Sequence, residues 1–185
     1  LISCSKIFSY AGQRAAFVAI DPELGKRVYP ALGERLNNNG ELLHSFSYSF
    51  LYVLSSGVCH SVQYGMAAML KAACEGKLRY VETTREYARR AKKIKEIMTR
   101  NGFHIVYDTD ADGQPVGDGF FFTFGYKDWT GKQLVNKLIY YGVSAIALES
   151  TGAKREGMRG CASTIREDQY EQLEERLRKF NEDFG

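Results

Sequence analysis

The sequence predicts an α/β protein whose second half is an α+β module, with helices packed on a small sheet. In that half the patterns follow one another as helix, two strands, helix, two strands and helix. Two of these helices start at capping boxes, formed by Thr130 with Gln133 and by Thr164 with Glu167. Residues 1–76 lack this regularity, so we expect a domain boundary between residues 76 and 77.

The first 76 residues contain weaker signals. An apolar run at residues 15–20 predicts a buried strand. Residues 21–54 show no helical or strand period, so we expect them to be irregular. Residues 58–76 repeat apolar side chains at helical spacing, and Ser55 or Ser56 is the expected N-cap. The predicted buried face of this helix comprises Val62, Met66, Met69 and Ala73.

Three helices are predicted in the second half from apolar residues at helical spacing. The first ends at Asn101, and its opposite face is rich in arginine and lysine, which is typical of a solvated surface. The second runs from Thr130 to a glycine stop at Gly142, and the third begins at Thr164. The inward-facing residues are Val81, Ala88, Ala91, Ile94 and Met98 in the first helix, Leu134, Val135, Leu138 and Ile139 in the second, and Tyr170, Leu173, Leu177 and Phe180 in the third.

Four strands are predicted between these helices. Residues 103–107 and 119–124 are expected to form a hairpin, joined through a polar turn at residues 110–113. Residues 143–148 and 158–162 are expected to complete the small sheet.

Composition and charge exclude several classes of protein. Hydrophobic residues make up 44% of the chain and charged residues 25%, proportions typical of a soluble globular protein. The net charge of +3 is spread along the chain, which argues against nucleic acid or an anionic membrane as a partner. No apolar stretch approaches the roughly 20 residues that span a bilayer. Four separated cysteines without a C-x-x-C motif indicate reduced thiols in a cytoplasmic protein, and no histidine has metal-ligand spacing.

The most informative segment is Ser-Cys-Ser-Lys-Ile-Phe-Ser-Tyr-Ala-Gly-Gln-Arg at residues 3–14. It resembles the S-x-S-K-x(7)-R signature of class I/II aminotransferases, which use pyridoxal 5'-phosphate. The resemblance implies that Lys6 forms a Schiff base with the cofactor and acts as the catalytic base, while Ser3, Ser5 and Arg14 hold its phosphate. Such chemistry needs an amine that can lose its proton, and a guanidinium whose fork matches phosphate oxygens.

A second match lies far from the first in the chain. Residues 142–153 and 156–162 resemble the strand, loop and strand with which the family presents an arginine to the α-carboxylate of the substrate. Arg159 would be that arginine, because a guanidinium can hold a carboxylate through two parallel hydrogen bonds. Arg155 is a nearby competitor, and an ordinary surface role for either arginine is the alternative.

The resemblance implies the C-terminal part of a fold-type-I aminotransferase, which moves an amino group between an amino acid and a 2-oxo acid. Residues 1–76 would end the large cofactor-binding domain, residues 77–185 would form the small domain, and the full-length protein would be a homodimer. In the family the carboxylate for the pyridine nitrogen, the aromatic that stacks on the ring and the phosphate-binding glycine loop come earlier in the chain. We therefore expect these 185 residues not to transaminate alone.

Two alternative functions remain open. Another fold-type-I enzyme, such as a lyase or an acyl-transferring synthase, would share the same signature. A non-catalytic aminotransferase-like module could instead bind the cofactor as an effector within a larger regulator.

Overall fold

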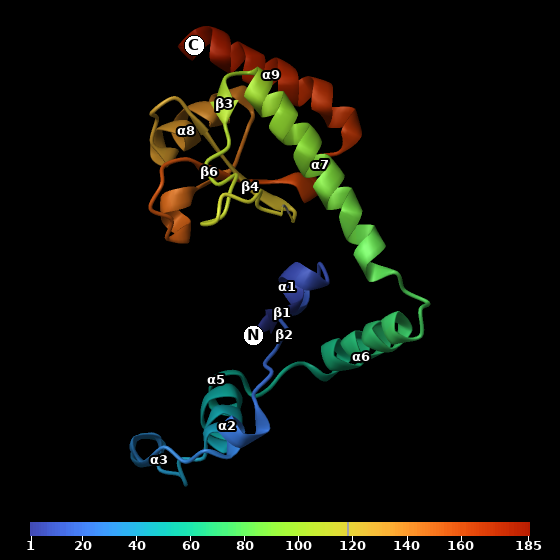
Figure 1. Ribbon diagram of the computed structural model, residues 1–185, viewed down its shortest axis with the longest axis vertical. Coiled ribbons are helices and arrows are strands. Elements are labelled where there is room, and N and C mark those ends of the chain that lie inside the picture. The colour runs from blue at the N-terminus through green and yellow to red at the C-terminus, as the bar shows by residue number, and fades with distance from the viewer. Residues whose placement is uncertain (118) are drawn as a thin grey trace. The chain divides into compact units, whose positions relative to one another are not determined.

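The computed structural model describes residues 1–117 and 119–185, without the side chain of residue 83. The chain divides into two compact units, Leu1–Leu78 and Arg79–Gly185, each described here by itself. The division falls two residues beyond the boundary expected after residue 76. Helices and two small sheets make up both units, in agreement with the predicted mixed α/β class (Figure 1).

The first unit is mainly helical, with a single two-stranded sheet near its start. Strands β1 and β2 pair in antiparallel orientation, with Ile2 opposite Phe17 and Ser3 opposite Ala16. The elements are β1 (Ile2–Ser3), α1 (Cys4–Ile7), a 3-10 turn η1 (Ala11–Gln13), β2 (Ala16–Phe17), α2 (Pro22–Lys26), α3 (Pro30–Leu36), α4 (Leu42–His44), a π-helix η2 (Ser45–Tyr52), α5 (Val53–Ser55) and α6 (His60–Cys74).

Two expectations for the start of the first unit are wrong. The strand expected at residues 15–20 is limited to Ala16–Phe17, because the partner strand β1 offers only two residues for pairing. Both residues of β2 are exposed. Residues 21–54 are largely helical rather than irregular. Asp21 begins α2 by accepting hydrogen bonds from the backbone N–H groups of Glu23 and Leu24, at 3.0 and 3.1 Å.

The serine cap expected for the next helix is also wrong. Helix α6 begins at His60 after Cys59, whose side chain makes no capping hydrogen bond. Ser56 instead ends α5 in a left-handed conformation, with φ of 55°. The glycine stop is confirmed, because Gly76 has φ of 71° and follows the last turn of α6. Val62 and Met66 are buried as predicted, whereas Met69 and Ala73 are half-buried.

The second unit builds one antiparallel four-stranded sheet in the order β3-β4-β6-β5. Helices α7 and α9 contact each other, and both cover the sheet together with α8 (Figure 1). The elements are α7 (Tyr80–Arg100), β3 (Phe103–His104), β4 (Phe121–Tyr126), α8 (Gly131–Leu138), β5 (Ile146–Ala147), β6 (Met158–Cys161), α9 (Tyr170–Phe184) and four 3-10 turns, η3 (Ile139–Tyr141), η4 (Leu148–Thr151), η5 (Ala162–Thr164) and η6 (Glu167–Gln169).

Successive side chains along a strand alternate between the two faces of this sheet. Phe122, Phe124 and Tyr126 of β4 are buried in the core against the three helices. The alternate residues of β4 and β6 point to the other face, where Phe121 and Arg159 are half-buried. The core face of the sheet and its helices therefore hold the unit together, and the other face is available to polar side chains.

Most predicted helix features of this unit are confirmed. Thr130 Oγ1 accepts a hydrogen bond from Gln133 N at 3.2 Å, and Gln133 Oε1 accepts one from Thr130 N at 2.8 Å. Gly142 stops this helical segment with φ of 70°. The predicted stripes are buried or half-buried at Ala91, Ile94, Met98, Leu134, Val135, Leu138, Tyr170, Leu173, Leu177 and Phe180.

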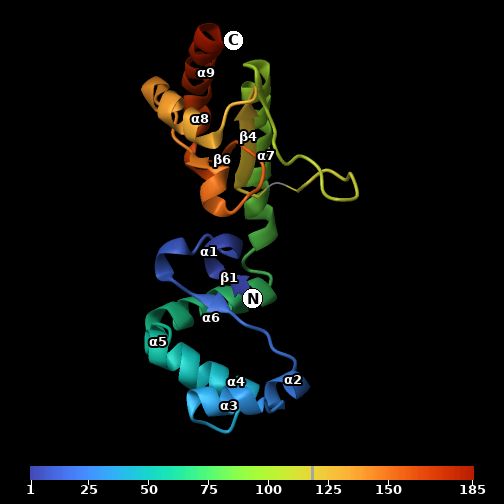
Figure 2. The same ribbon diagram turned by 90° about the vertical axis from the view of Figure 1, so that its left-hand side faces the viewer.

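Three predicted inward positions are exposed instead. Val81 and Ala88 lie on the first turns of α7, which extend past the end of the sheet (Figure 2). Ile139 is 55% exposed, because the chain tightens into a 3-10 turn after Leu138 and so rotates this position outward.

The second capping box is wrong as well. Thr164 Oγ1 donates to Cys161 O instead of capping a helix. The helical segment starts later, where Gln169 Oε1 accepts a hydrogen bond from Arg166 N at 3.0 Å.

The predicted strands pair as expected but are shorter. The hairpin is confirmed by the antiparallel pairing of Phe103 with Tyr126, although residues 105–107 lie outside the strand. The polar turn is confirmed by Asp110 Oδ1, which accepts hydrogen bonds from two backbone N–H groups. The strand at 158–162 forms as β6, whereas only two residues of 143–148 pair with it, as β5.

Candidate functional site

One short loop of the first unit holds all the residues assigned to the cofactor. Ser3 ends strand β1, Ser5 and Lys6 lie on helix α1, and Arg14 follows the 3-10 turn η1, ahead of strand β2. The loop is closed at its base by the pairing of Ser3 with Ala16 and by a hydrogen bond from Cys4 N to Ala15 O at 3.2 Å. Ser3 and Arg14 therefore lie at the two ends of the same closed loop.

Cys4 anchors this loop. Its side chain is fully buried against Val62 and Met66 of α6. Its carbonyl oxygen accepts hydrogen bonds from the N–H groups of both Phe8 and Tyr10, at 3.1 Å each. The loop is thus fixed by backbone bonds and by one buried side chain beside the lysine.

The cationic side chains of the loop reach the surface. Lys6 and Arg14 are exposed, Ser3 is half-buried, and Ser5 is buried. Arg14 has a left-handed backbone with φ of 53°, and its Nη1 donates to Ala11 O at 2.8 Å. A guanidinium carries five N–H donors, so this bond leaves most of them for another acceptor.

Arg159 lies in the second unit, on β6. It pairs through its backbone with Thr123 of β4 and Ile146 of β5. Its half-buried guanidinium lies over the ring of Phe121, with Cζ 4.3 Å from the ring centroid. Among the described residues, no carboxylate lies within ion-pair distance of Arg159.

Arg155, the competing arginine, has a structural role. Its Nη1 donates to Val106 O at 2.8 Å, and its guanidinium lies over the ring of Tyr107. These contacts tie residues 105–107 to the loop before β6. Arg159 is therefore the better candidate for a ligand.

Arg159 lines a pocket of about 370 Å³ in the second unit. Arg176 of α9 lines the same pocket and was not predicted from the sequence. The only signal for it was its position between the buried residues Leu173 and Leu177, which does not single out an arginine.

The N-terminal end of α6 carries one perturbed cysteine. A hydrogen bond with the Ser61 hydroxyl, together with the backbone N–H groups of Val62 and Ser61, lowers the pKa of the exposed Cys59 thiol. A lowered pKa makes a thiol more reactive at neutral pH.

In the described part of the chain, no group of histidine, cysteine, aspartate or glutamate side chains could hold a metal ion. None of the helices described is both long and apolar enough to cross a bilayer.

No protein-family model matches the chain, and no curated protein is significantly similar to it.

Proposed function

We propose that the chain carries the cofactor-binding lysine of a pyridoxal-phosphate-dependent aminotransferase, which moves an amino group between an amino acid and a 2-oxo acid. One observation carries this proposal. The segment that the pairing of β1 with β2 closes carries a lysine, an arginine and two serines, in the order and spacing of the family signature.

The side chains of the loop suit the cofactor chemically. Pyridoxal phosphate supplies an aldehyde for an amine and an electron-withdrawing ring for the substrate carbon. Arg14 supplies a fixed guanidinium fork for phosphate oxygens, and Ser3 and Ser5 supply hydroxyl donors. Lys6 supplies the exposed amine.

Each residue then has a separate task. Lys6 would hold the cofactor through its Nζ amine and would carry a proton to and from the substrate α-carbon. Arg14 holds the phosphate and so keeps the cofactor within reach of Lys6. Arg159 holds the α-carboxylate, which fixes the direction in which the substrate presents its amine.

Covalent trapping tests the assignment of Lys6. The chain is mixed with pyridoxal phosphate, the absorbance change is followed, and borohydride is added to reduce the bond between amine and aldehyde. Peptide mass mapping should locate the added mass on Lys6. Lys26 is a matched control, because it is an exposed lysine of the same unit, paired with Glu23.

The expected outcome is specific. Lys6→Ala should abolish most trapping at a cofactor concentration near that of the protein, while Lys26→Ala should retain it. Arg14→Ala should weaken trapping about tenfold or more, because a charge-assisted bond contributes about 1.5–3 kcal/mol. Labelling spread evenly over the exposed lysines would overturn the proposal.

A further inference from the structure

The pocket of the second unit is a slot between α9 and the segment before β5. Residues 142–146 line one side of it, and residues 169–176 line the other through Gln169, Gln172, Leu173 and Arg176. The slot opens because the ladder between β5 and β6 begins only at Ile146, so residues 142–145 diverge from the sheet. Its volume of about 370 Å³ is within the range of small-molecule sites.

The floor of the slot is apolar and belongs to the core face of the sheet. Phe122 and Phe124 of β4 line it together with Met98 of α7, and each of the three is at most 4% exposed. Gly160 of β6 also lines it, and a Cβ at this glycine would lie 2.6 Å from the ring of Phe122. The missing side chain therefore leaves the ring of Phe122 in contact with the backbone of β6. An alkyl group that enters the slot would leave water for an apolar surface.

The rim of the slot is polar along one side of α9. Gln169, Gln172 and Arg176 are separated by three and four residues, so they lie on the same side of this helical segment. Leu173 shares that side and is buried, whereas Gln172 is exposed and Gln169 is half-buried. A ligand whose apolar body lies on the floor would thus place a polar group at the rim.

Arg176 is a fixed cation at this rim. Its side chain is half-buried, and its Nη1 donates to Gly142 O at 2.7 Å, on the opposite wall of the slot. A guanidinium carries five N–H donors, so this single bond leaves most of them for another acceptor.

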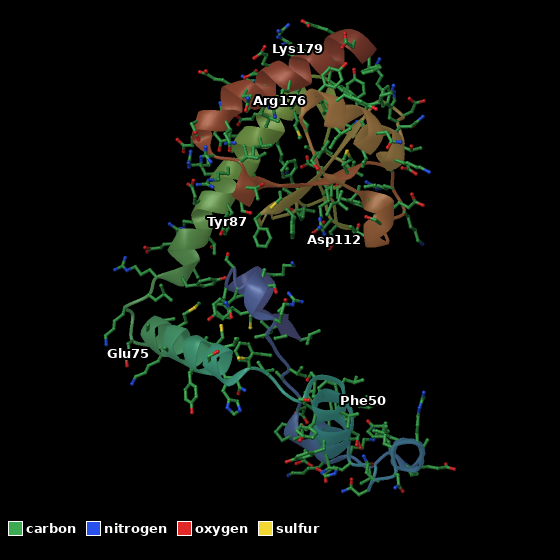
Figure 3. The ribbon with its side chains drawn as sticks, turned by 180° about the vertical axis from the view of Figure 1, so that it is seen from behind. Phe50, Glu75, Tyr87, Asp112, Arg176 and Lys179 are labelled. Carbon is green, nitrogen blue, oxygen red and sulfur yellow. The ribbon has the colours of Figure 1, made fainter. Side chains whose placement is uncertain are left out.

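The carboxylates next to Arg176 in sequence are engaged elsewhere. Glu174 pairs with Arg100 at 3.1 Å, and Glu175 pairs with Lys179 at 2.8 Å (Figure 3 labels Arg176 and Lys179 on α9). Among the described residues, no carboxylate lies within ion-pair distance of Arg176. Its charge is therefore available to an anionic ligand.

Arg159 does not add a second cation on this side of the sheet. It lines the pocket as well, but its guanidinium lies over the ring of Phe121, on the face away from the core. The core side of the slot thus combines one cation with an apolar floor.

We propose that this slot binds a small amphiphile with a single negative charge, whose carboxylate pairs with Arg176 and whose alkyl chain lies on Phe122 and Leu173. One guanidinium suits one carboxylate, because a second negative charge would enter the apolar slot without a partner. The site uses none of the residues assigned to pyridoxal phosphate, and it does not depend on the proposed aminotransferase function.

Three matched compounds test the proposal without any cofactor. Octanoate, butyrate and 1-octanol are each titrated into the isotope-labelled full chain, and the amide signals of Ser144, Gly160 and Leu173 are followed by NMR. Signals of individual residues separate the slot from the exposed apolar surface of the first unit. Octanoate should bind about tenfold or more tightly than butyrate, because each buried methylene contributes about 0.8 kcal/mol, a factor of roughly four.

The same titrations separate the role of charge. Octanoate should also bind about tenfold or more tightly than 1-octanol, because a hydrogen bond to a charged group contributes about 1.5–3 kcal/mol. Equal affinities for octanoate and 1-octanol, or for octanoate and butyrate, would overturn the proposal.

Arginine variants locate the carboxylate. Arg176→Gln should raise the dissociation constant of octanoate about tenfold or more and leave that of 1-octanol nearly unchanged. Arg178→Gln is the matched control, since it removes the same charge from the same helix at an exposed residue paired with Glu182. An equal loss in both variants would show that net charge, rather than the slot, attracts the anion. A loss in Arg159→Gln that equals the loss in Arg176→Gln would place the carboxylate on the other face of the sheet and would also overturn the proposal.

A filling variant locates the alkyl chain. Ala145 is a half-buried residue of the wall, so Ala145→Leu should occupy part of the slot. Loss of contact with about two methylenes should weaken octanoate and 1-octanol alike, by about tenfold. Circular dichroism of the variant checks that it is folded. Unchanged affinity in the folded variant would show that the alkyl chain binds elsewhere and would contradict the proposal.

Discussion

The two units of this chain differ in how they bury apolar side chains. In the first unit the buried cluster is small and centres on Cys4, Val62 and Met66. In the second unit one continuous cluster joins β3, β4 and β6 to α7, α8 and α9. Since burial of apolar surface dominates folding stability, the second unit should be the more stable one.

The first unit also exposes many large apolar side chains. They are concentrated on the segment from η2 through α5, where Leu54 is 81% exposed and Val53 is 71% exposed (Figure 3, near Phe50). Exposed apolar surface of this kind marks an interaction site or an aggregation hazard. The comparison indicates that the second unit is self-sufficient, whereas the first depends on further contacts.

The largest expected effect concerns the core of the second unit. Phe180 is fully buried and contacts the rings of Phe103, Tyr126 and Trp129. Phe180→Ala should lower the free energy of unfolding by about 3–5 kcal/mol, since it removes a large side chain and leaves a cavity. Denaturant unfolding followed by circular dichroism measures this. Val62→Ala in the first unit should have a smaller effect, and a larger one would reverse the comparison.

Two glycines, one in each unit, test the same difference in packing density. A Cβ at Gly131 would lie 2.4 Å from Gly157 O in the second unit, whereas a Cβ at Gly12 would meet nothing within 4 Å in the first. Gly131→Ala should therefore cost about 1–3 kcal/mol of stability through overpacking. Gly12→Ala should be nearly neutral. Similar melting temperatures for the two variants would contradict the difference in packing.

Self-association tests the exposed face of the first unit. We expect copies of the chain to associate at high concentration, because exposed apolar residues such as Leu54 can be buried between copies. Light scattering should show a mean mass that rises with concentration. Leu54→Lys should reduce the rise, while Tyr140→Lys, at an exposed aromatic of the second unit, should not. A monomer at all concentrations would count against the prediction.

The smallest expected effect is the acid sensitivity of α7. Hydrogen bonds from Arg89, and then from Arg90, lower the pKa of Glu86 from its ordinary 4.5 to about 2. A lowered folded-state pKa favours the ionised carboxylate, so its stabilising contribution is complete above about pH 4.5 and is lost as the pH falls toward 2. Glu86→Gln should flatten the pH dependence of the melting temperature within this window. An unchanged profile would show that solvent screens this exposed pair.

The parts of the fold that the sequence predicts correctly depend on local chemistry. The capping box at Thr130 and the stripe of α9 appear as expected, because caps and helical spacing act within one or two turns. The π-helix Ser45–Tyr52 was missed, since its alternating serines and aromatics show no 3.6-residue period. The shortness of β5 was missed because strand pairing depends on distant residues.

The candidate site shows the same division. Lys6 and Arg14 could be proposed from the sequence because one contiguous motif carries them. Arg176 could not, because it lines the same pocket as Arg159 only after α9 packs on the core and the segment before β5 diverges. Sequence alone has no signal for a pocket formed by three separate segments.

The backbone conformation of Arg14 lowers the stability of the loop, whereas its side chain is the group proposed to bind the phosphate. Its φ of 53° is a conformation that glycine adopts without penalty and that costs other residues about 1–2 kcal/mol. Arg14→Gly would relieve that strain, and it would also remove the guanidinium proposed for the phosphate. Directed selection for heat resistance should therefore favour glycine at this position, whereas selection for cofactor retention should restore arginine.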